Sequence, residues 1–281
     1  MTLTEFYWKV YLPTHRAGWA VATPQTYAVA VKRWGEFSTA DIGEINSRLL
    51  AEWQAWLLPG RSPVTVNNSL RIIRVILNYA TDEDVGLLVR VPRAKKLREP
   101  HRVPLALTIA EFGKVLLAAA HEKRAPLWRA FLLTGWETGL RVRGLLSLRP
   151  VDVLFDSGGL YCQPSGMKNA TAQWFALQPE TLQAIRAIYS IENELLFAFR
   201  IAPRQLQRIM RRILDSCGIY APHGPSMCFH RLRKSKASYT KLAGGSAMEA
   251  MGHSHPSVTA HYLDARICGS ATQPRMPLPR F

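Results

Sequence analysis

Apolar positions recur at helical spacing along most of this chain, and polar positions fill the intervals between them. In the first third, this pattern predicts helices over Gln25 to Phe37, over Ile45 to Leu58 and from Pro63 onward. Two of these helices follow the pairs Thr23-Pro24 and Ser62-Pro63, in which a capping side chain precedes a proline that fits the first helical turn. Residues 1–90 are therefore expected to form a small helical domain.

The hydrophobic period shortens toward two between Val151 and Leu177, which indicates strands. The candidate strands are Val151 to Phe155, Leu160 to Gln163 and Gln173 to Leu177. Glycine-bearing turns separate them, so a three-stranded antiparallel sheet is predicted. Helical spacing then returns over Pro179 to Ile191, Pro203 to Cys217, Leu232 to Leu242 and Pro256 to Tyr262. The expected fold class is mainly α with a small antiparallel β-sheet, an α+β arrangement.

A basic, proline-bearing stretch without an apolar period divides the chain near residue 100. Residues 90–104 hold three prolines and seven basic side chains when His101 is counted, which is typical of a linker. Beyond it, Thr108 and Glu111 stand at capping-box spacing, and an apolar helix over Leu127 to Trp136 is expected to end near Gly139. We therefore assign a helical domain to 1–90, a basic linker to 91–104, a second domain to 105–270 and an irregular tail to 271–281.

A strong positive charge indicates a polyanionic partner. The 281 residues include 36 lysines and arginines against 20 acidic residues, which gives a net charge of +16 and a pI near 10.1. Most of the excess lies after residue 100. Such a surface favours phosphate contacts with release of counterions, so nucleic acid is the expected partner.

Cysteine usage and the amino terminus bear on the compartment. Four cysteines without a CxxC pair indicate free thiols in a reducing environment. The first residues show neither the basic nor the apolar region of a signal peptide, and no apolar run reaches membrane-spanning length. We expect a cytoplasmic protein with no membrane partner.

Three motifs in the later part of the chain carry candidate chemistry. They are Thr138-Gly139-Leu140-Arg141, His230-Arg231-Leu232-Arg233, and Gly252-His253 followed nine residues later by Tyr262, with Lys168 between the first two. In residue types and order, this set resembles the active site of the tyrosine recombinases, the phage integrase family. The resemblance implies that 1–90 is the helical, SAM-like core-binding domain and that 105–270 is the catalytic domain, the two closing around double-stranded DNA.

The resemblance also implies a reaction and a set of catalytic residues. Tyr262 would cleave DNA at specific recombination sites to give a 3′-phosphotyrosyl link and a free 5′-hydroxyl, and strands would be exchanged through a Holliday junction in a homotetramer. The covalent link conserves the energy of the broken bond, so no cofactor and no metal are implied. Such a protein would associate with the nucleoid. The catalytic set would be Arg141, Lys168, His230, Arg233, His253 and Tyr262.

Each residue type suits one task in breaking a phosphodiester. Two guanidinium groups, those of Arg141 and Arg233, match the charged non-bridging oxygens. A tyrosine with a usual pKa of about 10 needs roughly 4 kcal/mol to form its phenolate at pH 7. His230 and His253 are therefore candidates to hydrogen-bond the phenol or to take its proton. Lys168, in a turn between two strands, is the candidate proton donor to the leaving 5′-oxygen.

The chain departs from the family pattern in three places. Gly144 stands three positions after the first arginine, where the family usually has an acidic residue, so the brace of Arg141 must come from elsewhere. The stretch from Arg233 to His253 is shorter than usual, and the chain after Tyr262 is short and proline-bearing. A DNA-binding relative that has lost catalysis is therefore an alternative. A relaxing type IB topoisomerase shares the same chemistry.

Two basic faces are candidates for DNA contact. Arg71 and Arg74 share a polar face with Asn67 on the helix that starts at Pro63. Four arginines without evident acidic partners form a second stripe: Arg204, Arg208, Arg211 and Arg212.

A zinc-binding module is the alternative from another class. Cys217, His223, Cys228 and His230 lie within fourteen residues of one another. Their spacing matches no usual zinc pattern, so no metal ligands are assigned.

Overall fold

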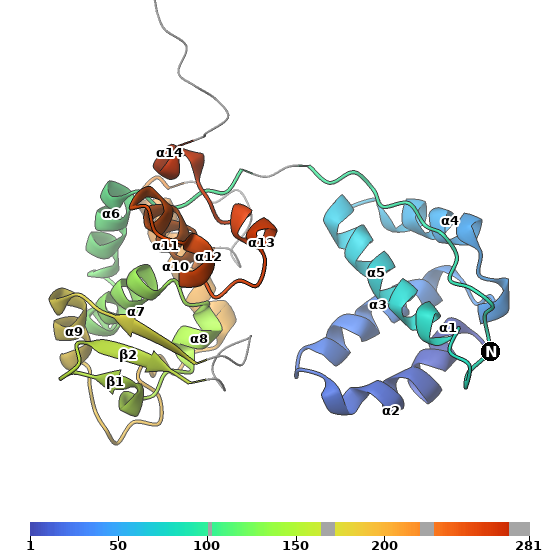
Figure 1. The fold of residues 1–281 in the computed structure, drawn as a ribbon, viewed down its shortest axis with the longest axis horizontal. Coiled ribbons are helices and arrows are strands. Elements are labelled where there is room, and N and C mark those ends of the chain that lie inside the picture. The colour runs from blue at the N-terminus through green and yellow to red at the C-terminus, as the bar shows by residue number, and fades with distance from the viewer. Residues whose placement is uncertain (101–102, 164–171, 220–227, 270–281) are drawn as a thin grey trace, which may run out of the picture. The chain divides into compact units, whose positions relative to one another are not determined.

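A computed structural model describes residues 1–100, 103–163, 172–219 and 228–269 of the chain. The chain divides into two units, Met1–His101 and Arg102–Phe281, which we call unit 1 and unit 2 (Figure 1). The division falls inside the segment predicted as a linker. None of the helices in the described ranges is long and apolar enough to cross a membrane.

Unit 1 is built from helices alone in its described residues. They are α1 (Leu3–Phe6), a π-helical turn (Tyr7–Tyr11), α2 (Leu12–His15), 3-10 turns at Arg16–Gly18 and Ile42–Glu44, α3 (Thr23–Phe37), α4 (Ser47–Leu57) and α5 (Pro63–Tyr79). Helix α5 starts as predicted, and the Ser62 hydroxyl accepts a hydrogen bond from the Thr65 amide. Helix α3 begins at Thr23 itself and follows Ala22 without a side-chain cap, so the predicted capping role of Thr23 was wrong. Helix α4 starts at Ser47, two residues later than predicted, because the Asn46 side chain accepts the first free amides.

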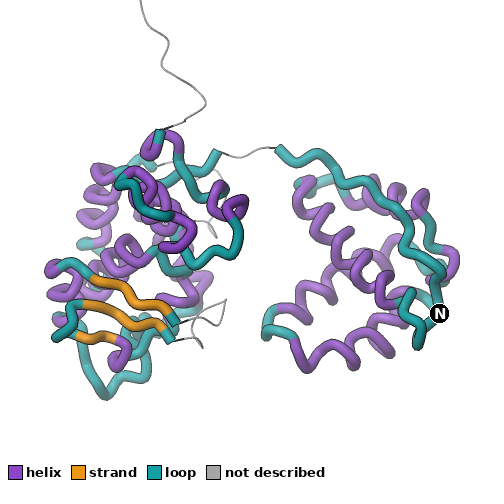
Figure 2. The backbone as a smooth tube through the Cα atoms, viewed as in Figure 1, coloured by secondary structure: helices purple, strands orange, loops and turns teal. Residues whose placement is uncertain are grey.

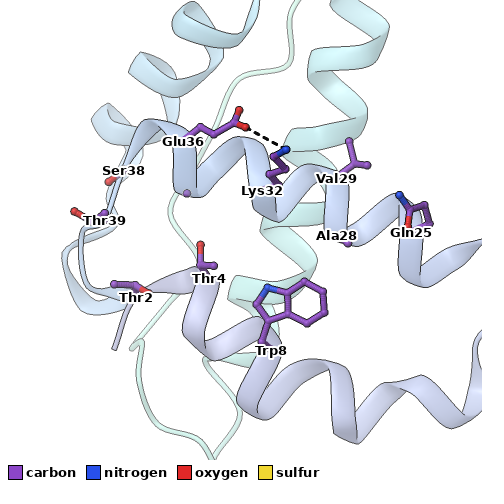
Figure 3. A pocket seen from close by; sticks show the side chains of 11 residues that line it. Thr2, Thr4, Trp8, Gln25, Ala28, Val29, Lys32, Glu36, Ser38 and Thr39 are labelled. Atoms are coloured by element: carbon purple, nitrogen blue, oxygen red, sulfur yellow. Dashed lines mark ion pairs between the residues drawn. The ribbon is translucent and has the colours of Figure 1, made fainter.

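The core of unit 1 forms where α3, α4 and α5 meet. Trp34 of α3 and Trp53 of α4 are fully buried, with ring centroids 5.3 Å apart in an edge-on arrangement. Helix α1 packs closely on α3, since a Cβ atom at Gly35 would lie 2.9 Å from the Thr4 hydroxyl oxygen. Beside this contact lies a groove of about 570 Å³, lined by the half-exposed Trp8 and by residues of α3, among them Ala28 and Lys32 (Figure 3). None of the candidate catalytic residues lines this groove.

Much of the segment predicted as a free linker packs on unit 1. The Asn67 side chain of α5 donates to the carbonyl oxygen of Leu97 and accepts from its amide, both at 2.9 Å. The Gln54 amide group of α4 donates to the carbonyl oxygen of Lys95 at 3.1 Å. Leu97 and Val91 pack against the apolar core of unit 1. Asn67 is consequently buried and holds this segment, so it is not part of an open polar face.

Unit 2 combines helices with a small sheet (Figure 2). Its helices are α6 (Ile109–Ala119), α7 (Ala125–Thr138), α8 (Val142–Leu146), α9 (Pro179–Arg186), α10 (Pro203–Ser216), α11 (His230–Leu242), α12 (Ala247–Ala250), α13 (Pro256–Ala260) and α14 (Ala265–Cys268), with a 3-10 turn at Pro150–Asp152. The strands are β1 (Val153–Leu154), β2 (Gly159–Cys162) and β3 (Gln173–Ala176), antiparallel in the order β1-β2-β3. The predicted fold class is confirmed.

The sheet has one buried and one exposed face. Leu160 of β2 pairs with Phe175 of β3, and both side chains enter the core. The next pair, Tyr161 and Trp174, points the other way and is partly exposed, as period-two alternation requires.

A cluster of aromatic rings fixes the start of α11. Phe229 precedes His230 and is buried, with its ring 5.5 Å from that of Phe131 at nearly a right angle. Trp128, one turn earlier on α7, lies parallel to Phe229 at 6.3 Å. Helix α7 therefore anchors the first turn of α11, which carries two of the predicted catalytic residues.

Candidate active site

The turn after α7 sets the position of Arg141. Gly139 ends α7 with a φ of +63°, and its amide closes the last turn on the Gly135 carbonyl oxygen. A side chain at 139 would be strained by this φ, and its Cβ would lie 2.8 Å from Met251 and 2.9 Å from Lys236. Leu140 is buried, so the chain emerges with Arg141 extended just before α8.

Arg233 is buried on α11 and held by neutral acceptors. Its two terminal nitrogens donate to the carbonyl oxygens of Gly139 and Met251, each at 2.8 Å. Burial, and then the charge of Arg141, lower the pKa of Arg233. Neither arginine pairs with a carboxylate in the described part of the chain, and Arg141 makes no hydrogen bond there. Two neighbouring cations without a counter-charge favour an anion between them.

His253 is a neutral acceptor for Arg233. Its Nε2 lies 3.0 Å from an Arg233 nitrogen, which can only donate. The ring proton must then be on Nδ1, which lies 3.0 Å from the Thr259 hydroxyl and donates to it. Burial, with Arg233 and Arg141, lowers the pKa of His253 to about 4, so the ring stays neutral at pH 7.

His230 is the histidine that contacts the tyrosine hydroxyl. Its Nε2 lies 3.2 Å from the Tyr262 oxygen. Burial comes first among the causes that lower the pKa of His230 to about 4, followed by Arg233, Lys234 and Arg141. Both histidines were predicted to serve the phenol, and the structure distinguishes them, because Arg233 occupies the Nε2 of His253.

Tyr262 lies in a turn and not at the end of a helix. Helix α13 was predicted to run through Tyr262, but it ends at Ala260, and the Tyr262 amide bonds to the Thr259 carbonyl oxygen at 2.8 Å. The ring is half-buried, with the guanidinium carbon of Arg233 5.3 Å from its centroid. The early helix end turns the chain back toward α11, where Leu263 packs with Met251.

The short stretch before His253 still forms a helix. Helix α12 makes a single turn, capped by the Ser246 hydroxyl, which accepts from the Glu249 amide. The residue that follows α12, Met251, supplies one of the two carbonyl oxygens that hold Arg233. The shortening therefore leaves the support of this arginine in place.

The remaining expectations for the site concern Lys168 and the residue that braces Arg141. Lys168 lies outside the described residues. Gly144 is buried in α8, and the carboxylate of Glu137, four residues before Arg141 in the sequence, accepts from the Gln178 amide and the Thr181 hydroxyl. Among the described residues, no acidic side chain pairs with Arg141, whose backbone is extended at the start of α8.

The α10 stripe departs from its sequence prediction. Arg204 and Arg208 are exposed. Arg211 is paired with Asp215 at 2.9 Å and Arg212 with Glu122 at 2.7 Å, so the expected lack of acidic partners was wrong for these two. Glu122 is 90 residues away in sequence and reaches α10 only through the tertiary fold. On α5, Arg71 is exposed and Arg74 half-buried.

Two members of the cysteine and histidine cluster, Cys228 and His230, have other surroundings in the described residues. Cys228 is fully buried, which raises the pKa of its thiol, and His230 is turned to Tyr262. In the described ranges, no three His, Cys, Asp or Glu side chains are placed to hold a metal ion. His223 lies outside those ranges.

Sequence reasoning missed two residues of the site. Thr259, three residues before the tyrosine, fixes the proton of His253. Asp264, two residues after the tyrosine, is completely buried. Their only signal in the sequence was that a hydroxyl residue and an acidic residue lie within three positions of the predicted nucleophile.

Several solved structures share the fold of this chain. The fold is similar to that of the Tn1549 transposon integrase in complex with circular intermediate DNA, with a TM-score of 0.78, 17% identity, and coverage of 95% of this chain and 98% of that one. It is similar to lambda integrase bound to a COC′ core site, with a TM-score of 0.76, 17% identity, and coverage of 99% and 100%. It is also similar to the XerH site-specific recombinase bound to palindromic difH substrate, with a TM-score of 0.68, 20% identity, and coverage of 85% and 75%.

The family assignment comes from the sequence itself. No curated protein matches the chain. The model of the phage integrase family matches residues 107–267, which is more than half of the chain and contains all six predicted catalytic residues. The chain belongs to the phage integrase family.

Proposed function

We propose that this protein is a site-specific DNA recombinase that cleaves and rejoins DNA through Tyr262. The observation that carries the proposal is the contact between the Tyr262 hydroxyl and the neutral His230, beside two arginines that lack a carboxylate partner in the described residues. The DNA bound to the similar Tn1549, lambda and XerH proteins supports DNA as the partner.

In this proposal, the scissile phosphate lies between Arg141 and Arg233. Their guanidinium groups stabilise the charge that builds up on the non-bridging oxygens as the Tyr262 oxygen bonds to phosphorus. The bond from phosphorus to the 5′-oxygen breaks, and Lys168 donates a proton to that oxygen. The product is a 3′-phosphotyrosyl link and a free 5′-hydroxyl, with no external energy source.

His230 is the proposed acceptor of the phenolic proton. It is neutral at pH 7 and its Nε2 already faces the hydroxyl. Burial, and after it the charges of Arg233, Lys234 and Arg141, lower its pKa in the free protein. A bound phosphate, which is negative, would offset those charges and make His230 a stronger base at the moment of attack. His253 would act through Arg233, which it orients by accepting one of its hydrogen bonds.

The same proposal extends to assembly and location. Strand exchange through a Holliday junction requires four cleaving subunits, so we propose a homotetramer on two recombination sites. Arg204 and Arg208 of α10, with Arg71 of unit 1, are the exposed arginines that we assign to the DNA phosphates. The protein would then act at the nucleoid.

Covalent capture tests the proposed function. DNA held covalently by the wild-type protein in its host is purified, and the attached ends are sequenced. A nicked duplex with those ends, which loses the strand needed for religation, should then accumulate a covalent adduct. Tyr262→Phe removes one oxygen atom and should bind the duplex without forming the adduct.

The outcomes separate the alternatives. Wild-type protein that binds DNA tightly but never forms an adduct would establish the inactive DNA-binding relative, consistent with Gly144. An adduct accompanied by relaxation of supercoils, without exchange of strands between two duplexes, would establish a type IB topoisomerase.

A further inference from the structure

Asp264 is a buried carboxylate that joins the turn carrying Tyr262 to the first residues of unit 2. It has no exposed surface, and its Oδ2 accepts from the Ala106 amide at 2.7 Å. The same oxygen pairs with the Arg266 guanidinium at 2.7 Å. Burial raises the pKa of Asp264, but the Arg266 hydrogen bonds and the Ala106 amide outweigh it and hold that pKa below its usual value. The carboxylate is therefore ionised at neutral pH.

The Ala106 peptide is fixed on its other side as well. Its carbonyl oxygen accepts from Arg231 at 3.3 Å and from Arg266 at 3.0 Å. The next amide, of Leu107, donates to the Ser235 hydroxyl at 2.8 Å. Arg231 and Ser235 both belong to α11. The segment to which Asp264 bonds is thus held rigidly on the helix that carries His230 and Arg233.

The turn itself is attached to the same helix. The Ser238 hydroxyl of α11 donates to the Tyr262 carbonyl oxygen at 3.4 Å and accepts from the Asp264 amide at 2.9 Å. Two side chains therefore fix the backbone around the tyrosine. The Ser238 hydroxyl bonds directly to the backbone of the turn. The Asp264 side chain, which is part of the turn, bonds to Ala106, 158 residues away in sequence.

We propose that Asp264 is a positioning residue for the nucleophile. It fixes the turn after α13 so that the Tyr262 oxygen stays beside His230 and faces the phosphate that Arg141 and Arg233 would hold. This inference rests on the proposed cleavage by Tyr262. A displacement of about 1 Å at a reacting group can cost on the order of 100-fold in rate, so even a small movement of this turn is measurable.

The test uses the nicked duplex in two forms. In one form the leaving group is the natural 5′-oxygen, and in the other it is sulfur, which departs without a proton donor. Asp264→Asn keeps the shape of the side chain but removes the charge that pairs with Arg266. Ser238→Ala removes the second attachment without leaving a buried charge unpaired, so it serves where the first variant folds poorly. Thermal melting and DNA affinity are measured for each.

A matched control exists in the same unit. The Glu137 carboxylate also ties distant segments by accepting a backbone amide, that of Gln178, and its other hydrogen bond in the described residues goes to the Thr181 hydroxyl, outside the tyrosine turn. Glu137→Gln should form the adduct at the wild-type rate. Lys168→Ala supplies the opposite comparison, since a missing proton donor should be rescued by the sulfur leaving group.

We expect both variants to form the adduct about 10- to 100-fold more slowly on both duplexes, with DNA affinity within about twofold of the wild type. Wild-type rates in both variants, rescue of the rate by sulfur, or a parallel loss of DNA affinity would each overturn the inference. If the wild-type protein forms no adduct, the proposed function fails first and this inference fails with it.

Discussion

Acidification should destabilise this protein through His230 between pH 6.5 and about 4. Burial and three neighbouring cations lower the pKa of His230 from its usual 6.5 to about 4. In this interval the unfolded chain binds a proton that the folded chain does not bind, so the free energy of unfolding falls as the pH falls. Above pH 6.5 the histidine is neutral in both states and has no effect.

The expected magnitude follows from the two pKa values. Each pH unit of difference corresponds to about 1.4 kcal/mol, so His230 alone should remove about 3 kcal/mol of stability by pH 4. The same burial and the same arginines act on His253, whose pKa is also about 4. Because the two rings share these neighbours, their titrations are coupled. Their contributions to the pH dependence of the free energy of unfolding are therefore not simply additive.

The assay is urea unfolding, followed by circular dichroism, at several pH values from 7.5 to 4.5. His230→Gln should lose stability less steeply than the wild type, by up to about 1.4 kcal/mol per pH unit. His121→Gln, in the exposed turn after α6, is the control for loss of a histidine and should follow the wild-type curve. If His230→Gln and the wild type differ by the same free energy at every pH, His230 is not held neutral by its surroundings.

Three further predictions concern the site and the DNA surface. Gly139→Ala should lower the free energy of unfolding by about 2 kcal/mol in thermal or urea denaturation, because of its positive φ and the blocked Cβ position, and should slow adduct formation. Thr259→Val, which removes the hydroxyl that accepts from His253, should slow the adduct rate more than Thr259→Ser, and equal rates would contradict the assigned tautomer. Arg208→Ala should reduce the slope of log affinity against log salt by about 0.9, while Arg212→Ala, whose guanidinium is already paired, should change it less; the reverse order would contradict the assignment.

Local signals in the sequence predicted the long elements well. Thr108 and Glu111 form the expected capping box at the start of α6, and Ser62 caps α5 as predicted. The alternation between Val151 and Leu177 correctly predicted a three-stranded antiparallel sheet. Helices α8, α12 and α14 have only four or five residues, too few to show a period, and the sequence analysis missed them.

The geometry of the site depends on contacts between distant residues, which no local pattern contains. The sequence identified two histidines as partners of the phenol, but only the position of Arg233 decides which of them faces it. The pairing of Arg212 with Glu122 and the bond from Ala106 to Asp264 likewise join residues 90 and 158 positions apart. The types of side chain were therefore predictable, and their partners were not.

The Gly139 peptide supports both arginines of the proposed phosphate site. Its backbone turn directs Arg141 outward, and its carbonyl oxygen binds the Arg233 guanidinium. A change in the length or tilt of α7 would consequently move Arg141 and, at the same time, one of the two carbonyl oxygens that hold Arg233. Variation at this one peptide would therefore disturb both halves of the cation pair at once.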